Sequence, residues 1–218
     1  MAQRQPHTVL LTGFDPFGDD TINPSWEAVS QLHGETIAGR CIVSEQLPTT
    51  FAGAPRALRA ALRRHAPELV LCVGQAGGRA ALSLERVAIN VNDARILDNA
   101  GAQPVDTPVV ARGPAAYFTS LPIKAMHADL HAAGIPAEIS QTAGTFVCNQ
   151  VFYVLMHALA GTRVRGGFLH IPYLPQQVAT MPGTPSLDLD TVVAGLRISI
   201  DTALRTRRDL RIGAGATH

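Results

Sequence analysis

Residues 69–74 read LVLCVG, an apolar run of strand length that ends at a glycine, and this pattern predicts a strand buried on both faces. The preceding segment, roughly 54–64, places Leu58 and Leu62 four residues apart with arginines on the other face, as an amphipathic helix does. Before it, residues 41–43 read CIV and predict another strand. This strand–helix–strand order indicates a parallel βαβ unit.

The same alternation continues along the chain. Further buried strands are predicted at 9–11, 137–140 and 167–170, and helices at about 148–160 and 187–207. Asp188 and Asp190 at the start of the last helix and arginines near its end suit the helix dipole. Because no long Ser/Gly/Pro linker divides these elements, we expect one α/β domain over 1–218, with a largely parallel sheet and a frayed tail at about 209–218.

One region interrupts the α/β alternation. Residues 82–91 read LSLERVAINV and alternate apolar and polar side chains over part of their length, as a strand covered on one face would. The following DNAG at 98–101 and the prolines at 104 and 108 are typical of turns. We therefore expect a projecting hairpin or loop here.

Composition narrows the classes of function. The 218 residues are 46% hydrophobic and 16% charged, with a formal net charge of +1, which excludes bulk disorder and disfavours nucleic acid or an anionic membrane as partner. No apolar run approaches the roughly 20 residues of a membrane span, and residues 1–6 lack a signal-peptide layout, so we expect a cytoplasmic protein. Cys41, Cys72 and Cys148 are odd in number and widely spaced, which fits a reducing compartment without disulfides.

Motifs for cofactors and metals are missing. GQAGG at 74–78 follows a strand but matches neither the dinucleotide fingerprint nor the P-loop, so we expect these glycines to allow a sharp turn or a close approach. His127 and His131 have the i,i+4 spacing of two metal ligands, yet no neighbouring ligand motif supports a metal, and a solvated helix face is expected. We predict no metal and no cofactor.

Cys148 has a different setting from the other two cysteines. It follows TAGTFV at 142–147 and opens a predicted helix, where free amides and the helix dipole favour a thiolate and could bind an oxyanion. From spacing alone, a nucleophile and a buried structural cysteine remain equally open. His170 ends a predicted buried strand, and Glu85 lies among apolar neighbours; a base and its orienting acid are what a cysteine nucleophile needs.

Five blocks of sequence together resemble the pyroglutamyl peptidase I, or pyrrolidone-carboxylate peptidase, family. They occur in the family's order over nearly the whole chain: VLLTGFDPFG at 9–18 with NPSW at 23–26, GQAGGR at 74–79, ERVAIN at 85–90, GTFVCN at 144–149 and HIP at 170–172. The resemblance implies an α/β/α sandwich, no metal, and removal of an N-terminal pyroglutamyl residue from peptides through a thioester. It also implies Cys148 as nucleophile, His170 as general base and acid, and Glu85 as the group that orients the imidazole.

The resemblance also implies a substrate pocket and an assembly. Its apolar walls are Phe14, Phe17, Ile96, Phe146 and Val147, its polar contacts are Asn23 and Gln75, and Arg95 is a candidate for electrostatic support. Aromatic walls suit the flat faces of a lactam, whose edge needs hydrogen bonds. Because family members often form dimers or tetramers, a homo-oligomer is expected.

Two other functions stay open at this point. The same triad could serve a cysteine hydrolase of another small amide or lactam, which a panel of lactam substrates would separate. The fold could also carry a non-catalytic binder of cyclic amides, although all three triad residue types are present. A burst assay with a pyroglutamyl amide would distinguish the binder from the enzymes.

Overall fold

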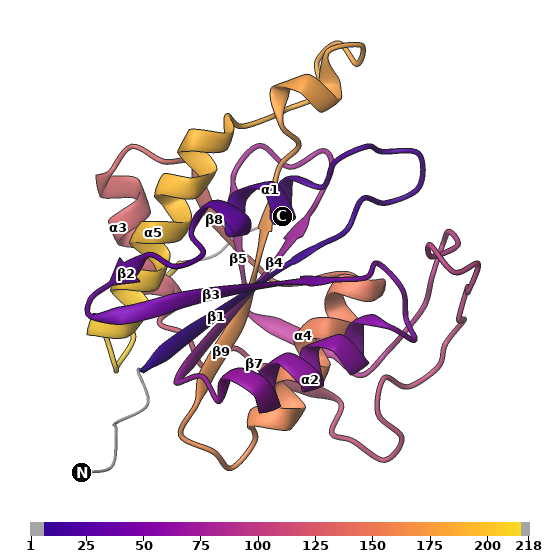
Figure 1. The fold of residues 1–218 in the computed structure, drawn as a ribbon, viewed down its shortest axis with the longest axis horizontal. Coiled ribbons are helices and arrows are strands. Elements are labelled where there is room, and N and C mark those ends of the chain that lie inside the picture. The colour runs from indigo at the N-terminus through magenta and orange to yellow at the C-terminus, as the bar shows by residue number, and fades with distance from the viewer. Residues whose placement is uncertain (1–6, 215–218) are drawn as a thin grey trace.

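A seven-stranded sheet forms the centre of the molecule in a computed structural model that describes residues 7–214 (Figure 1). Its strand order is β2-β3-β1-β4-β9-β5-β8. The strands are β1 (Thr8–Phe14), β2 (Thr36–Ile37), β3 (Arg40–Leu47), β4 (Leu69–Gln75), β5 (Leu82–Glu85), β8 (Ala137–Ser140) and β9 (Arg165–Ile171). The predicted strands at 9–11, 41–43, 69–74, 137–140 and 167–170 all lie in this sheet.

Most strand pairs of the sheet are parallel, as predicted. β1 pairs in parallel with β3 and β4, β4 with β9, and β5 with β8. Two pairs are antiparallel, namely β2 with β3 and β5 with β9. The strands β4 and β9 are parallel, so their carboxyl ends meet at one edge of the sheet. β5 runs in the opposite direction to β9 and reaches it from the other edge.

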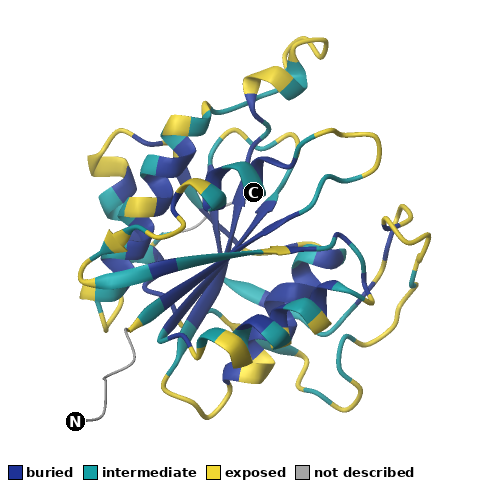
Figure 2. Cartoon of the chain, viewed as in Figure 1, coloured by how far each residue is buried: buried dark blue, intermediate teal, exposed yellow. Residues whose placement is uncertain are grey.

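Helices cover both faces of the sheet and make the fold an α/β/α sandwich (Figure 1). α1 (Pro24–Gln31), α3 (Ile123–Ala132) and α5 (Leu189–Arg205) lie on one face, and α2 (Ala54–His65) and α4 (Val147–Leu159) on the other. A short 3-10 helix, η1 (Pro175–Val178), follows β9. Most residues of the other five strands are buried, whereas β2 and β3 at one side of the sheet are largely half-buried or exposed (Figure 2). Two apolar cores form, one on each face of the sheet.

The stretch 82–91 differs from its prediction as one strand covered on one face. It divides into β5, which belongs to the central sheet, and β6 (Val87–Ile89), which pairs antiparallel with β7 (Ala116–Phe118) in a separate two-stranded sheet. All four residues of β5 are buried, because β9 and β8 flank it and helices cover both faces. Local alternation could not reveal this burial, since it comes from distant segments of the chain.

A long loop between β6 and β7 projects from the body of the molecule, as expected (Figure 1). It contains an isolated antiparallel bridge between Asn92 and Thr107. Asp98 organises its turn, since its carboxylate accepts hydrogen bonds from the amides of Ala100 and Ala102, both at 2.8 Å. Much of the loop is exposed (Figure 2), yet Asp98 itself is buried.

The described part of the C-terminal segment packs onto the domain. The Asp209 carboxylate accepts bonds from the amides of Lys124 and Ala125 at the start of α3, and Arg86 donates to the carbonyl of Ala214. Residues 1–6 and 215–218, the latter being the end of the expected tail, lie outside the described residues. None of the helices in 7–214 is long and apolar enough to cross a membrane.

Candidate active site

A cavity of about 170 Å³ opens where β1 and β4 end and where the segment after β3 begins. Open α/β sheets place their ligand sites at this edge, the carboxyl ends of the parallel strands. Eight side chains line the cavity: Phe14, Phe17, Asn23, Thr49, Gln75, Ile96, Phe146 and Cys148. Seven of them were predicted from the sequence as site residues, and the eighth is Thr49.

Cys148 brings a thiol to this cavity from the first turn of α4. It is the second residue of the helix, so its amide has no acceptor within the helix. Its Sγ lies against Gly74 of β4, because a Cβ built on Gly74 would come within 2.9 Å of that sulfur. Gly74 in turn is the strand partner of His170 in the β4–β9 pairing. The missing side chain therefore admits the thiol beside the strand position that carries the imidazole.

His170 and Glu85 form a buried hydrogen-bonded pair. The Nδ1 atom of His170 lies 2.7 Å from Oε1 of Glu85, and the two residues are 4% and 0% exposed. The antiparallel β5–β9 pairing sets Ser83 opposite His170, and Glu85, two residues on, shares the face of Ser83. Because a carboxylate only accepts, it fixes the proton on Nδ1 and leaves the Nε2 lone pair free.

Arg79 is a fourth member of this cluster that the sequence reasoning did not identify. Its Nη1 donates to the same Oε1 of Glu85 at 2.7 Å, and its Nη2 donates to the carbonyl of Thr142 at 3.2 Å. Arg95, the sequence-based candidate for electrostatic support, is exposed and makes no hydrogen bond or ion pair with any residue in 7–214. The GQAGGR block contained Arg79, but nothing local showed where its side chain would point.

The pKa of the Cys148 thiol is raised to about 12, mainly by burial and then by the negative charge of Glu85 and the nearby Cys72, against the lowering effect of Arg79. The helix start favours a thiolate, whereas burial and the negative charge of Glu85 favour the neutral thiol. Burial also raises the pKa of the Cys72 thiol to about 12. In the free protein Cys148 is therefore a neutral thiol at physiological pH.

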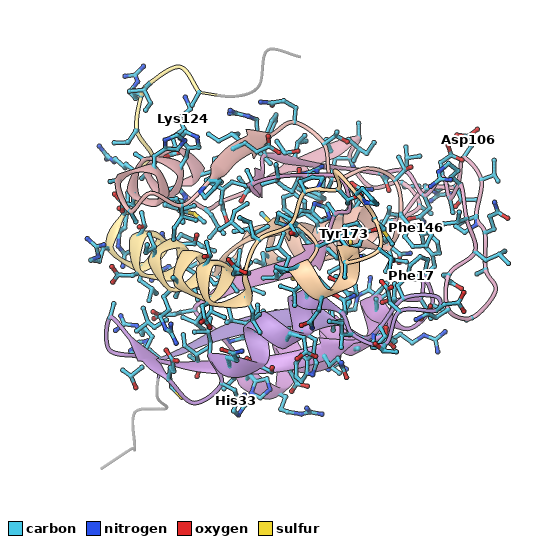
Figure 3. The ribbon with its side chains drawn as sticks, turned by 90° about the horizontal axis from the view of Figure 1, so that it is seen from above. Phe17, His33, Asp106, Lys124, Phe146 and Tyr173 are labelled. Carbon is cyan, nitrogen blue, oxygen red and sulfur yellow. The ribbon has the colours of Figure 1, made fainter. Side chains whose placement is uncertain are left out.

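Aromatic rings form most of the cavity wall. Phe146 packs edge-on against Phe17 at a centroid distance of 5.6 Å and against Phe51 at 5.1 Å. Figure 3 shows Phe17 and Phe146 beside each other, with Asp106 further out on the projecting loop. Val147 was predicted as a further wall residue, but as the first residue of α4 it is fully buried in the core and does not line the cavity.

The two predicted polar contacts differ in how far their amides are already engaged. The Asn23 Oδ1 accepts from the amide and hydroxyl of Ser25, and its Nδ2 donates to the carbonyl of Asp15. Asn23 is thus the N-cap of α1 as well as a cavity residue. Gln75 accepts from Nε2 of Gln177 at 3.1 Å, and its own Nε2 has no partner within 7–214.

Thr49 and the projecting loop are held at the cavity by a shared set of bonds. The Thr49 amide donates to Oδ1 of Asp15, and the Thr49 carbonyl accepts from the amide of Asn99. The side chain of Asn99 also bonds the backbone of Pro16 and Gly18. These bonds place Ile96 at the cavity. The position of Thr49 just after a parallel strand was the one sequence signal that could have identified it.

The described residues contain no group of three or more His, Cys, Asp or Glu side chains that could hold a metal ion. His127 and His131 lie on α3 with ring centroids 4.6 Å apart. His131 is exposed and His127 half-buried, as on the expected solvated helix face.

A thiol at a helix start, beside a strand that carries an imidazole bonded to a carboxylate, supplies the groups that activate a sulfur nucleophile. The aromatic cavity around that thiol offers a place for a small flat acyl group. The fold and the site fit the class of cysteine peptidases.

Comparison with known proteins specifies the family. A family model described as pyroglutamyl peptidase matches residues 7–206. The chain is 62% identical over 213 residues to pyrrolidone-carboxylate peptidase 1 of Ralstonia nicotianae, covering 97% of this chain and 99% of that protein. It is 63% identical to pyrrolidone-carboxylate peptidase of Cupriavidus taiwanensis, over 97% and 99% of the two chains.

Solved structures agree with these relatives. The pyroglutamyl peptidase I crystal structure from Bacillus amyloliquefaciens superposes with a TM-score of 0.92 and 50% identity, covering 95% of this chain and 100% of that chain. A mutant pyrrolidone carboxyl peptidase from Pyrococcus furiosus gives a TM-score of 0.88 and 39% identity over 91% and 98% of the chains. The chain belongs to the pyroglutamyl peptidase family.

Proposed function

We propose that this protein hydrolyses the amide bond after an N-terminal pyroglutamyl residue of peptides, with Cys148, His170 and Glu85 as its catalytic triad. The observation that carries the proposal is the position of Cys148: its side chain lines the aromatic cavity and lies against Gly74, the strand partner of His170. Neither Cys41 nor Cys72 lines that cavity.

The reaction begins from a neutral thiol. As the Cys148 sulfur attacks the pyroglutamyl carbonyl, the free nitrogen of His170 takes the thiol proton, which the raised pKa of the thiol would otherwise retain. The carbonyl oxygen becomes an oxyanion. The amide N–H of Cys148, unpaired within α4, is suited to stabilise that charge.

The oxyanion then collapses, the carbon–nitrogen bond breaks, and His170 donates its proton to the departing amine. A pyroglutamyl thioester on Cys148 remains. A water molecule attacks this thioester while His170 takes one of its protons, and collapse releases pyroglutamate and restores the thiol. Glu85 keeps the imidazole in the required tautomer through both halves and stabilises the imidazolium that forms in each.

The cavity suits this acyl group. Phe14, Phe17 and Phe146 offer faces and edges to the lactam ring, and the unpartnered Nε2 of Gln75 can donate to the lactam carbonyl. A second function, hydrolysis of another small lactam, would use the same triad. The family membership favours the pyroglutamyl group.

The proposal extends to location and assembly. We place the protein in the cytoplasm, because all three of its cysteines are free. We also propose a homo-oligomer, a dimer or a tetramer, on the family resemblance. Sedimentation of the purified protein across a range of concentrations tests the assembly.

The deciding experiment is hydrolysis of a chromogenic pyroglutamyl amide by the parent and by Cys148→Ser, Cys41→Ala and His170→Asn. We expect Cys148→Ser and His170→Asn to lose turnover and Cys41→Ala to retain it, since Cys41 lies on β3 outside the cavity. Alkylation of the parent with iodoacetamide should abolish turnover in step with labelling of Cys148. An inactive parent, or a Cys148→Ser variant as active as the parent, would refute the proposal.

A further inference from the structure

Arg79 joins two parts of the site that are distant in sequence. Its guanidinium bonds the Glu85 carboxylate through Nη1 and the Thr142 carbonyl through Nη2, at 2.7 and 3.2 Å. Thr142 lies in the loop that leads from β8 into α4, six residues before Cys148. One side chain therefore holds both the triad acid and the segment that delivers the nucleophile.

Glu85 needs a permanent counter-charge. Its carboxylate is completely buried, and a buried carboxylate is costly unless it is paired. The imidazole of His170 provides a positive charge only after it has taken a proton, so it cannot serve as counter-ion while it acts as a base. A guanidinium is always charged, and Arg79 pairs with Glu85 at 2.7 Å, so it supplies a counter-charge whether or not the imidazole is protonated.

The bonding of the carboxylate shows how its orientation is set. Both Arg79 and His170 donate to Oε1, while the buried Oε2 has no partner among residues 7–214. One oxygen is thus held by two donors, and the other is held by none. If Arg79 were absent, the hydrogen bond to His170 alone would have to fix the carboxylate.

We propose that Arg79 is a positioning residue of the reaction, whose guanidinium keeps Glu85 ionised and directed at His170 while the imidazole is neutral, and ties it to the loop that leads into Cys148. This inference rests on the proposed triad. It assigns to Arg79 the electrostatic support that the sequence suggested for Arg95. Arg79 does not line the cavity, so its effect must reach the substrate through Glu85 and His170.

The other titratable groups around the pair are few. Cys148 approaches from α4 and Cys72 from β4, and both thiols are neutral at physiological pH because burial raises the pKa of each to about 12. On β8, Glu138 accepts a bond from the hydroxyl of Ser83 at 2.6 Å, beside the strand position of His170. Without Arg79, the Glu85 carboxylate would keep His170 as its one hydrogen-bond partner within 7–214, and its unbalanced negative charge would favour the imidazolium.

The test compares the pH profile of kcat/KM for a pyroglutamyl amide in the parent, Arg79→Gln and Arg79→Lys. The acid limb of the profile reports protonation of the base in the free enzyme. Arg79→Gln should move that limb upward by about one pH unit, as loss of an adjacent charge does, and lower kcat with KM within a few fold. Arg79→Lys, which keeps the charge but not both bonds, should return the limb towards its parental position.

Arg86→Gln is the matched control. It removes an arginine directly next to Glu85 in sequence, but that side chain bonds the carbonyl of Ala214 and not the triad. Its acid limb should stay in place. An unmoved limb in Arg79→Gln, or equal displacement in the Lys and Gln variants, would overturn the inference and leave Arg79 with a structural role. If Arg79→Gln does not fold, Arg79→Lys decides: a parental limb with lowered kcat supports the inference, and a displaced limb overturns it.

A readout independent of turnover separates this inference from the proposed function. The guanidinium lowers the pKa of Cys148, so iodoacetamide should label that thiol more slowly in Arg79→Gln than in the parent at the same pH. Failure of the parent to hydrolyse pyroglutamyl amides would refute the function and leave the labelling comparison valid. Equal labelling rates in both proteins would overturn the role proposed for Arg79 and leave the proposed function untouched.

Discussion

The Cys148 sulfur occupies space that any side chain at Gly74 would need, since a Cβ there would lie 2.9 Å from Sγ. The ring of Phe168 closes the same space from another side, with its nearest carbon 2.8 Å from that Cβ position. Gly74 is thus required by a close approach and not by a turn. The register of β4 and β9 places this gap next to His170.

Gly74→Ala should therefore reduce kcat by about 10²-fold, because the added methyl group would displace the Cys148 sulfur, and a displacement of about 1 Å in a reacting group can lower the rate by that factor. Overpacking should also lower the free energy of unfolding by about 1–3 kcal/mol. Gly166→Ala on β9 is the control, since its Cβ would meet the Leu159 side chain at 2.7 Å, away from the cavity. That variant should lose stability but retain kcat, measured by urea unfolding and steady-state kinetics. Equal kcat in both variants would contradict the role given to Gly74.

The raised thiol pKa predicts how Cys148 reacts in the free enzyme. Below a pKa of about 12, the thiolate fraction rises with each added pH unit. Labelling by iodoacetamide, followed at Cys148 by mass spectrometry in a Cys41→Ala background, should climb from pH 6 to pH 10 without a plateau. Free cysteine, whose thiol pKa is roughly 8.5, should level off within that range. A plateau for Cys148 near neutral pH would indicate a resting thiolate and contradict the assignment of a neutral thiol to the free enzyme.

Glu85→Gln should lower kcat strongly, by up to about 10⁴, with KM within a few fold. The amide of glutamine can donate to Nδ1, which would shift the imidazole proton to Nε2 and remove the base. Glu138→Gln is a suitable control, because Glu138 lies on the neighbouring strand and bonds Ser83, not His170. Steady-state kinetics of both variants check the prediction. A Glu85→Gln variant with parental kcat would remove Glu85 from the triad and leave a Cys-His dyad.

Discrimination between pyroglutamyl and prolyl amides should depend on Gln75. Proline lacks the lactam carbonyl and carries a charged amine, and a site built to bond the missing group can discriminate by about 10⁴. Gln75→Ala should reduce the ratio of kcat/KM for the two substrates, because Gln75 has an unpartnered Nε2 at the cavity. Gln177→Ala, which removes the partner of Gln75, should reduce it less. If Gln75→Ala kept the parental ratio of kcat/KM for the two substrates, backbone groups and not Gln75 would form the hydrogen bonds to the lactam.

Asn23→Ala should act mainly on stability. The side chain of Asn23 caps α1 and bonds the carbonyl of Asp15, so its loss should cost about 1 kcal/mol in the free energy of unfolding. Asn23→Asp keeps the capping oxygen and should recover most of that stability. Thermal unfolding of the two variants decides the point. If Asn23→Ala were as stable as the parent but no longer discriminated between pyroglutamyl and prolyl amides, the main role of Asn23 would be to contact the substrate.

The sequence by itself determined the fold class and most of the elements. Strands buried on both faces are continuously apolar, and surface helices have a 3.6-residue period, so both patterns are visible within a short window, as at β4 and α2. The family blocks also predicted Glu85, Cys148 and His170 as the triad. The setting of Cys148 at a helix start was correctly predicted, but the burial that raises its thiol pKa could not be, because desolvation depends on every layer packed around the thiol.

Only the tertiary structure decided how the groups meet. Antiparallel pairing of β5 with β9 brings Glu85 to His170 across 85 residues of chain, and no local pattern encodes that register. The same holds for Arg79, whose partners are set by the fold of its loop, and for Val147, which the helix turns into the core. Hydrophobic periodicity is a local property of a chain. Side-chain contacts and charge environments come from segments that are distant in sequence and meet only when the sheet has formed.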